Sequence, residues 1–186
     1  MKYDEYYQQE QLFGEPYPEL ISFFKTHPER GKLLDFGCGQ GRDAIPLARL
    51  GYEVTGVDNS KVGIAQMNKI AQAEKLNLMG IVADIYQYDD FSNFDFILLD
   101  SLFHFLKADR EKETDFIKKM ISHAKPGTII NFCIQHTGHK VAVLNQVIDS
   151  NKILKRLQET DLQYIYKDDQ TGHSSTTDYK MIVIIT

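Results

Sequence analysis

Apolar residues recur along the chain with two alternating periods, one typical of buried strands and the other of amphipathic helices. Short β-rich runs fall at residues 32–36, 52–57, 78–83, 94–99 and 128–134, and helical patterns fall at 41–50, 60–75, 109–124 and 140–160. Gly51 is placed to end the first of these helices and Ser60 to cap the second. This alternation predicts a parallel sheet that is covered by helices.

The end of the chain departs from this alternation. Residues 162–167 and 179–185 are both strand-like, and the polar stretch between them is too short to hold a crossover helix. Parallel neighbours need such a crossover, so we expect an antiparallel hairpin here. The expected fold is therefore α/β: a Rossmann-like, doubly wound, seven-stranded sheet, mostly parallel, with an antiparallel C-terminal hairpin strand.

The first thirty residues precede the expected sheet. An aromatic start, with Tyr3, Tyr6, Tyr7 and Phe13, leads into a short amphipathic helix at 19–26. This segment either caps the core or forms a lid over a ligand at the carboxyl ends of the strands, where open α/β sheets bind ligands. We expect one domain over residues 1–186, made of an N-terminal helical cap (1–30) and a Rossmann-like core (31–186).

The composition is that of an ordinary soluble domain. The 186 residues are 42% hydrophobic and 25% charged, the net charge is −5, and no Lys/Arg cluster occurs, which disfavours nucleic acid as a partner. No apolar run is long enough to cross a bilayer, and the polar N-terminus is not typical of a signal peptide, so we expect a cytoplasmic protein. The two cysteines, Cys38 and Cys133, form neither a disulfide framework nor a zinc motif.

The stretch LLDFGCGQGRDA, residues 33–44, places three glycines directly after the first expected strand. Gly37 and Gly39 match the start of the dinucleotide fingerprint G-x-G-x-x-G, but Arg42 stands where its third glycine would be. Asp35, two residues before the first glycine, would repel a pyrophosphate and attract a cationic amine. The turn therefore favours a nucleoside with a zwitterionic tail over a nicotinamide dinucleotide.

Acidic residues also end the next two expected strands. Asp58 is placed to accept hydrogen bonds from both hydroxyls of a ribose. Asp84 is placed to accept from an adenine amino group, and Ile85 offers the ring apolar contact. The structural alternative is that each carboxylate only caps a following helix. Three such residues beside a glycine turn favour a nucleotide-like ligand.

These residues resemble the class I S-adenosylmethionine-dependent methyltransferases. The resemblance extends over nearly the whole chain and includes LLDFGCGQG (33–41), VTGVDNS (54–60), VADI (82–85), FDFILLDSLFHF (94–105) and AKPGT (124–128). The single-domain form is most similar to the small tellurite-resistance and thiopurine type. This resemblance implies S-adenosyl-L-methionine as cofactor and S-adenosyl-L-homocysteine as product.

The resemblance also implies which residues bind the cofactor: Asp35, Phe36, Gly37, Gly39, Asp58, Asn59, Asp84, Ile85 and Asp100. Asp35 would meet the methionine amine, directly or through water, and the backbone of the glycine turn would pass close under the methionine part. Asn59 would border the adenine, and the carbonyl of Asp100 would meet the amino group.

Methyl transfer from a sulfonium is an in-line displacement, in which alignment of donor and acceptor contributes up to about 7–11 kcal/mol. A general base is needed only for an acceptor that arrives protonated with a high pKa. His104, in DSLFHFL, is the candidate catalytic residue, as a base or as an orienting group; the alternative is a structural ring bonded to backbone. His136 and His139 follow the fifth expected strand, but no recognisable ligand spacing accompanies them, so no metal is expected.

Two absences narrow the acceptor. The Asn/Asp-Pro-Pro-aromatic signature of amino-group methyltransferases is replaced by DSLF, and the multiple cysteines of arsenic methyltransferases are missing. We expect a small-molecule acceptor with an oxygen, nitrogen, sulfur or metalloid centre, and a monomer or homodimer. Two other functions stay open at this point: a non-catalytic S-adenosylmethionine-binding sensor or partner-activating subunit, and an NAD-dependent oxidoreductase, which Arg42 and the terminal hairpin disfavour.

Overall fold

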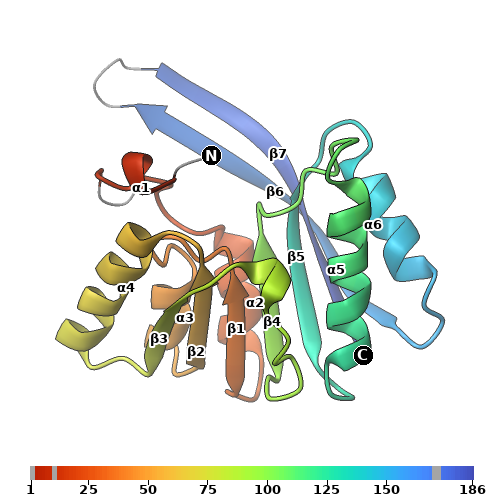
Figure 1. Cartoon of the computed structure of the whole chain (residues 1–186), viewed down its shortest axis with the longest axis horizontal. Helices are drawn as coiled ribbons and strands as arrows, with labels where there is room; N and C mark the ends of the chain where they lie inside the picture. Colours follow the sequence, from red (N-terminus) through yellow and green to blue (C-terminus); the bar gives the residue numbers. More distant parts are fainter. Residues whose placement is uncertain (1–2, 10–11, 169–172) are drawn as a thin grey trace. The chain divides into compact units, whose positions relative to one another are not determined.

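Seven strands form a mixed sheet in the order β3-β2-β1-β4-β5-β7-β6 (Figure 1). The computed structural model describes residues 3–9, 12–168 and 173–186. The fold is the expected α/β, Rossmann-like one, mostly parallel with antiparallel C-terminal strands. Two compact units make up the chain: Met1–Tyr88 with Phe94–Leu98, and Asp89–Asn93 with Leu99–Thr186. Across the described ranges, no helix is both long and apolar enough to cross a membrane.

The first unit is built on three parallel strands. These are β1 (Lys32–Phe36), β2 (Glu53–Asp58) and β3 (Leu78–Val82). Its helices are α1 (Tyr3–Tyr6), α2 (Pro18–Thr26), α3 (Ala44–Arg49) and α4 (Lys61–Glu74), and the short 3-10 turn η1 (Ile85–Gln87) follows β3. Phe36 pairs with Val57, and Asp58 with Val82, so the three strands end at the same edge.

The limits of two helices in this unit have local causes. As predicted, the Ser60 hydroxyl accepts a hydrogen bond from the Gly63 amide at 3.0 Å and begins α4, which Lys75 ends in the left-handed conformation. The helix predicted from Gly41 begins only at Ala44. Gly41 has a φ of +87°, which a right-handed helix does not contain, so residues 41–43 form a turn instead.

Helix α2 is anchored by aromatic packing at the amino ends of the strands. The Phe24 ring meets the rings of Tyr52 and Phe96 edge-on, at 5.3 and 5.8 Å between centroids. The Tyr52 hydroxyl donates to the Phe24 carbonyl at 2.9 Å, and burial raises the pKa of this phenol. Tyr52 precedes β2 and Phe96 begins β4 (Phe96–Asp100), so α2 caps the core and does not cover the carboxyl ends.

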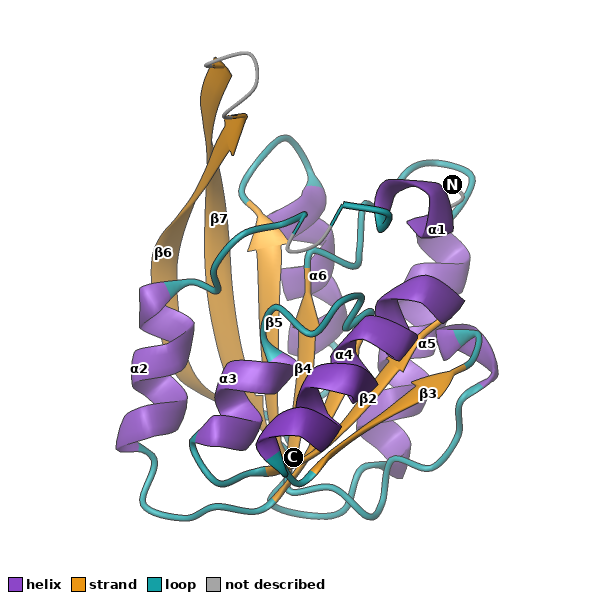
Figure 2. Ribbon diagram, turned by 90° about the vertical axis from the view of Figure 1, so that its left-hand side faces the viewer, coloured by secondary structure: helices purple, strands orange, loops and turns teal. Residues whose placement is uncertain are grey.

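The second unit contains the predicted hairpin, but both strands are longer than the expected 162–167 and 179–185. Strand β7 (His173–Ile185) pairs antiparallel with both β5 (Ile129–Gln135) and β6 (Lys155–Asp168). Strand β5 ends where Gln135 lies opposite Tyr179, but the pairing of β6 with β7 continues beyond that point (Figure 2). Helices α5 (Arg110–His123) and α6 (Lys140–Asp149) belong to the same unit, and α6 packs on β5.

The helix predicted over residues 140–160 is wrong in its second half, because α6 ends at Asp149. The Asn151 side chain accepts from the Ile153 amide at 3.1 Å and forms a turn. From Lys155 onward the backbone instead forms hydrogen bonds with β7. Leu157, within the range predicted as helix, lies at the irregularity between Arg156 and Gln158 in the strand pairing and is 48% exposed. Long-range strand pairing here prevails over a local helical pattern.

Candidate functional site

The glycine turn follows β1 with three residues of positive φ. Gly37, Gly39 and Gly41 have φ values of 71°, 53° and 87°, a region that glycine enters without steric cost. A Cβ at Gly39 would collide with the Tyr7 hydroxyl, and one at Gly41 would lie 2.6 Å from Met67 Cγ of α4. Gly41 therefore leaves room for the Met67 side chain of α4 to approach the turn closely.

Asp58 joins the end of β2 to this turn. Its Oδ2 accepts from the Gly39 amide at 3.0 Å, and its Oδ1 accepts from the Ser60 amide at 2.7 Å. Asp58 is only 8% exposed, and this burial raises the pKa of the carboxyl although the amides of Ser60, Gly39 and Asn59 lower it. Each carboxylate oxygen has a second lone pair, so the Asp58 carboxylate retains capacity to accept from a ligand.

The turn is an acidic environment. Cys38, inside the turn, is buried, and burial raises the pKa of its thiol well above the ordinary value; the charges of Asp35 and Asp58 raise it further. A neutral buried thiol is a poor nucleophile, so Cys38 acts as a packing residue. Two buried carboxylates beside the turn oppose a pyrophosphate and favour a ligand with a cationic group.

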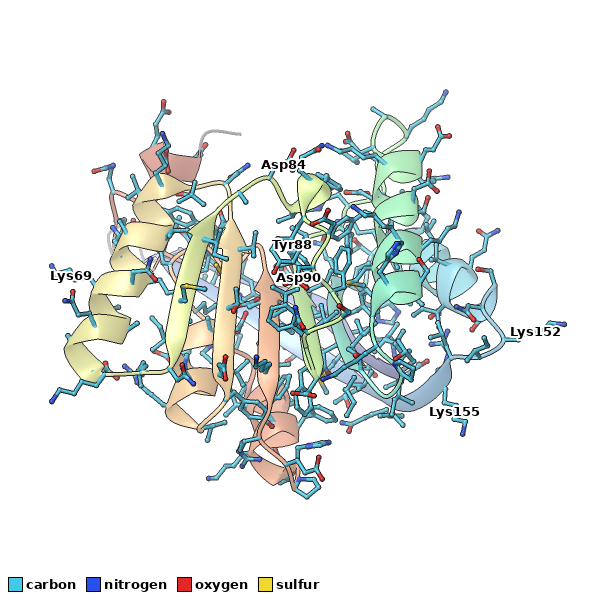
Figure 3. The ribbon with its side chains drawn as sticks, turned by 60° about the horizontal axis from the view of Figure 1, so that its bottom comes forward. Lys69, Asp84, Tyr88, Asp90, Lys152 and Lys155 are labelled. Carbon is cyan, nitrogen blue, oxygen red and sulfur yellow. The ribbon has the colours of Figure 1, made fainter. Side chains whose placement is uncertain are left out.

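Asp84 follows β3 and caps the next turn (Figure 3). Its Oδ1 accepts from the Tyr86 amide at 3.0 Å, which is the structural role considered above for such carboxylates. The neighbouring Ile85 is buried, whereas Asn59 after β2 is exposed. Phe36, at the end of β1, is buried with its ring 5.4 Å from that of Tyr88.

Eight of the nine expected cofactor residues thus fall in the first unit, near the carboxyl ends of β1, β2 and β3: Asp35, Phe36, Gly37, Gly39, Asp58, Asn59, Asp84 and Ile85.

The N-terminal segment also contacts the beginning of α4, which the sequence did not predict in detail. The Asp4 carboxylate accepts from the Ser60 hydroxyl at 2.5 Å and from the Val62 amide at 3.2 Å. Tyr7 is 4% exposed, and its carbonyl accepts from the Gln66 side chain at 2.8 Å. The only sequence signal for this docking was the aromatic start.

The loop after β4 carries the two remaining candidates, Asp100 and His104, both in the second unit. The Asp100 carboxylate is 9% exposed and accepts from the Ser101 hydroxyl at 2.8 Å. Ser101 and Phe105 have φ values of 55° and 50°, which are unfavourable for residues with side chains. Such backbone strain persists only where surrounding contacts hold it.

Glu113 of α5 supplies those contacts, and sequence reasoning missed it. It is 4% exposed, and its two oxygens accept from the amides of His104 at 3.2 Å and Phe105 at 2.6 Å. The carbonyl of Phe105 accepts in turn from Nε2 of His139 at 2.8 Å. The backbone-bonded structural role considered for His104 therefore belongs to His139.

The His104 ring is exposed, and Nζ of Lys140 lies 3.4 Å from its Nδ1. His136 lies elsewhere, exposed, with Nδ1 3.9 Å from an Asp161 oxygen. In the part of the chain that the structure describes, no three His, Cys, Asp or Glu side chains are grouped so as to hold a metal ion.

The model of the family described as "Tellurite resistance protein TehB" matches residues 1–138. A curated relative, "Probable S-adenosyl-L-methionine-dependent methyltransferase TehB" of Haemophilus influenzae (strain 10810), is 40% identical over 96 residues, which cover 52% of this chain and 33% of that protein. "Ubiquinone biosynthesis O-methyltransferase" of Rickettsia typhi is 30% identical over 112 residues, 60% of this chain and 44% of that protein. The chain matches only about a third of the length of its TehB relative.

Solved structures share the fold. The crystal structure of TehB from Haemophilus influenzae matches with a TM-score of 0.74 and 22% identity, covering 99% of this chain and 65% of that one. Magnesium protoporphyrin IX methyltransferase from Synechocystis, solved with bound S-adenosylmethionine, matches with a TM-score of 0.67 and 15% identity, covering 97% of this chain and 79% of that one. With the family model matching most of its residues, the chain belongs to the TehB family.

Proposed function

We propose that the chain is an S-adenosyl-L-methionine-dependent methyltransferase that acts on a small-molecule acceptor with an oxygen, nitrogen, sulfur or metalloid centre. The observation that carries this proposal is the Asp58 carboxylate, held by the amides of Gly39 and Ser60 beside an acidic glycine turn. The names of the TehB and Rickettsia relatives support it. When bound, the cofactor supplies a methyl group attached to a sulfonium; transfer of this methyl group to the acceptor leaves S-adenosyl-L-homocysteine.

The residues of the first unit fit such a cofactor. The free lone pairs of Asp58 would accept from the ribose hydroxyls, and the glycine backbone would lie against the methionine part. Asp35 supplies a negative charge for the amine, and buried Ile85 an apolar surface beside Asp84 for the adenine. The roles of Asn59 and of the Asp100 carbonyl rest on the family resemblance.

We propose that His104 is the residue that contacts the methyl acceptor. The net charge of −5 without a basic cluster supports a small molecule rather than a nucleic acid. We further propose a cytoplasmic monomer or homodimer.

Calorimetric titration tests the cofactor. S-adenosyl-L-homocysteine should bind to the wild type, and Asp58→Ala should weaken that binding by about tenfold or more, because hydrogen bonds to a charged group are lost. Glu53→Ala, at the exposed opposite end of β2, is the matched control and should bind normally. Binding of NAD in place of S-adenosyl-L-homocysteine would overturn the proposal.

Methyl transfer is tested separately with radiolabelled cofactor and a panel of small acceptors that includes tellurite. Label should appear in at least one acceptor product. Cofactor binding without transfer to any acceptor would favour the non-catalytic sensor instead.

A further inference from the structure

The backbone that carries the His104 ring is held by side-chain hydrogen bonds. The buried carboxylate of Glu113 accepts from the amides of His104 and Phe105, and His139 donates to the carbonyl of Phe105. These three bonds engage three successive peptide units, from the one before His104 to the one after Phe105. Because Phe105 has a positive φ, the bonds also offset the cost of that conformation. The backbone position from which the His104 ring extends is therefore held in place.

Lys140 then defines the chemical state of this ring. Its ammonium lies 3.4 Å from Nδ1 of His104, and an ammonium can only donate hydrogen bonds. The contact is a hydrogen bond only if Nδ1 accepts, and in a neutral imidazole an accepting Nδ1 places the proton on Nε2. The opposite tautomer would direct an N–H group at a positive charge. No hydrogen bond to Nε2 of His104 is formed within residues 3–9, 12–168 and 173–186, and the ring is exposed, so Nε2–H is accessible to a ligand.

The charge of Lys140 does not stabilise the helix that carries it. It is the first residue of α6, where a positive charge is unfavourable to the helix dipole. Its other partner is the neutral Oε1 of Gln135 at the end of β5, and among the residues that the structure describes no carboxylate pairs with it. The ammonium is thus held by two neutral acceptors, one of which is the His104 ring.

We propose that Lys140 is a positioning residue that fixes His104 in its Nε2–H tautomer, so that His104 presents a hydrogen-bond donor, and not a general base, to the methyl acceptor. The part of this inference that concerns the acceptor rests on the proposed function. The acceptor accordingly carries a lone-pair atom, such as an oxygen, next to the methylated centre. It also needs no proton removed by this histidine.

The tautomer is measured directly by long-range ¹⁵N–¹H correlation NMR of the ¹⁵N-labelled protein, at a pH where the rings are neutral. The His104 signals are identified by their loss in His104→Gln. We expect the wild type to show a protonated Nε2 and an unprotonated Nδ1, Lys140→Arg to preserve this pattern, and Lys140→Met to give averaged shifts of a tautomer mixture. Lys155→Met, an exposed lysine at the start of β6, is the control and should change nothing.

An Nδ1–H tautomer in the wild type, or unchanged His104 shifts in Lys140→Met, would overturn the proposal. Because the experiment contains no cofactor and no acceptor, its outcome is independent of whether the protein transfers methyl groups.

Discussion

The Ser60 hydroxyl donates to the Asp4 carboxylate at 2.5 Å, although 56 positions separate the two residues. Ser60 is also the N-cap of α4, and its amide donates to Asp58. One residue therefore connects the N-terminal segment, the start of a helix and the carboxylate proposed to bind ribose. Displacement of the N-terminal segment should therefore alter the hydrogen bonding of Ser60, which also bonds Asp58 at the proposed cofactor site.

This docking should depend on pH. The bonds from Ser60 and then Val62 lower the pKa of Asp4 in the folded protein. The stabilisation is therefore complete above the unfolded pKa of about 3.9 and is lost as the pH falls through the lower folded value. Hydrogen exchange of the Val62 amide should show lower protection in Asp4→Asn at neutral pH. Glu5→Gln, on the same helix, is the control; equal Val62 protection in wild type and Asp4→Asn would contradict the prediction.

Gly39→Ala should cost more stability than its backbone conformation alone explains. The new Cβ would collide with the Tyr7 hydroxyl. Gly138 offers a matched control, because it has the same φ of 53° but nothing within 4 Å of a Cβ. Urea denaturation should show a loss of about 1 kcal/mol for Gly138→Ala and a larger loss for Gly39→Ala.

Tyr7→Phe should restore part of the loss in the Gly39→Ala background, since it removes the colliding oxygen. Equal losses for the two alanine variants would mean that Tyr7 does not occupy this position in solution.

Glu113→Gln should loosen the loop after β4. The amide that replaces one oxygen cannot accept from a backbone N–H, so one of the two bonds to His104 and Phe105 is lost. We expect the free energy of unfolding to fall by about 1–3 kcal/mol, with faster hydrogen exchange at the Phe105 amide. Glu111→Gln, exposed on the same helix, should have neither effect, and a stable Glu113→Gln protein with normal exchange would exclude this role.

Cys38 should be unreactive in the folded protein. Burial and the charges of Asp35 and Asp58 raise the pKa of its thiol, so the reactive thiolate fraction is very small at neutral pH. Ellman's reagent should therefore label the native protein slowly and label both cysteines after unfolding in denaturant. Cys133 is also buried, and a Cys133→Ala variant isolates the Cys38 signal. Rapid labelling of Cys38 in that native variant would contradict its burial beside Asp35 and Asp58.

Local patterns predicted the first five strands and the Ser60 cap of α4 because each depends on neighbours in sequence. The alternation that predicts β1 and the hydroxyl that begins α4 act over a few residues, and the carboxyl edge then follows from parallel strands. The placement of Asp58 needs no more than this.

Contacts between residues that are distant in the sequence could not be predicted from such local patterns. Glu113 resembles any other acidic residue of an amphipathic helix until the fold places it under His104. Residues 155–160 fit a helical pattern, yet they pair with β7 as part of a strand. In both cases a partner far along the chain determines the outcome, and no local period encodes that partner.

The continuation of β6 and β7 beyond Gln135 gives this family member a part whose length can vary independently of its core. Side chains alternate between faces along a strand, so adding or removing two residues in each strand keeps every remaining side chain on its present face. Because β5 pairs only with the later part of β7, such changes leave that register intact. The length of the hairpin beyond Gln135 can thus change in steps of two residues while the pairing of β5 with β7 stays the same.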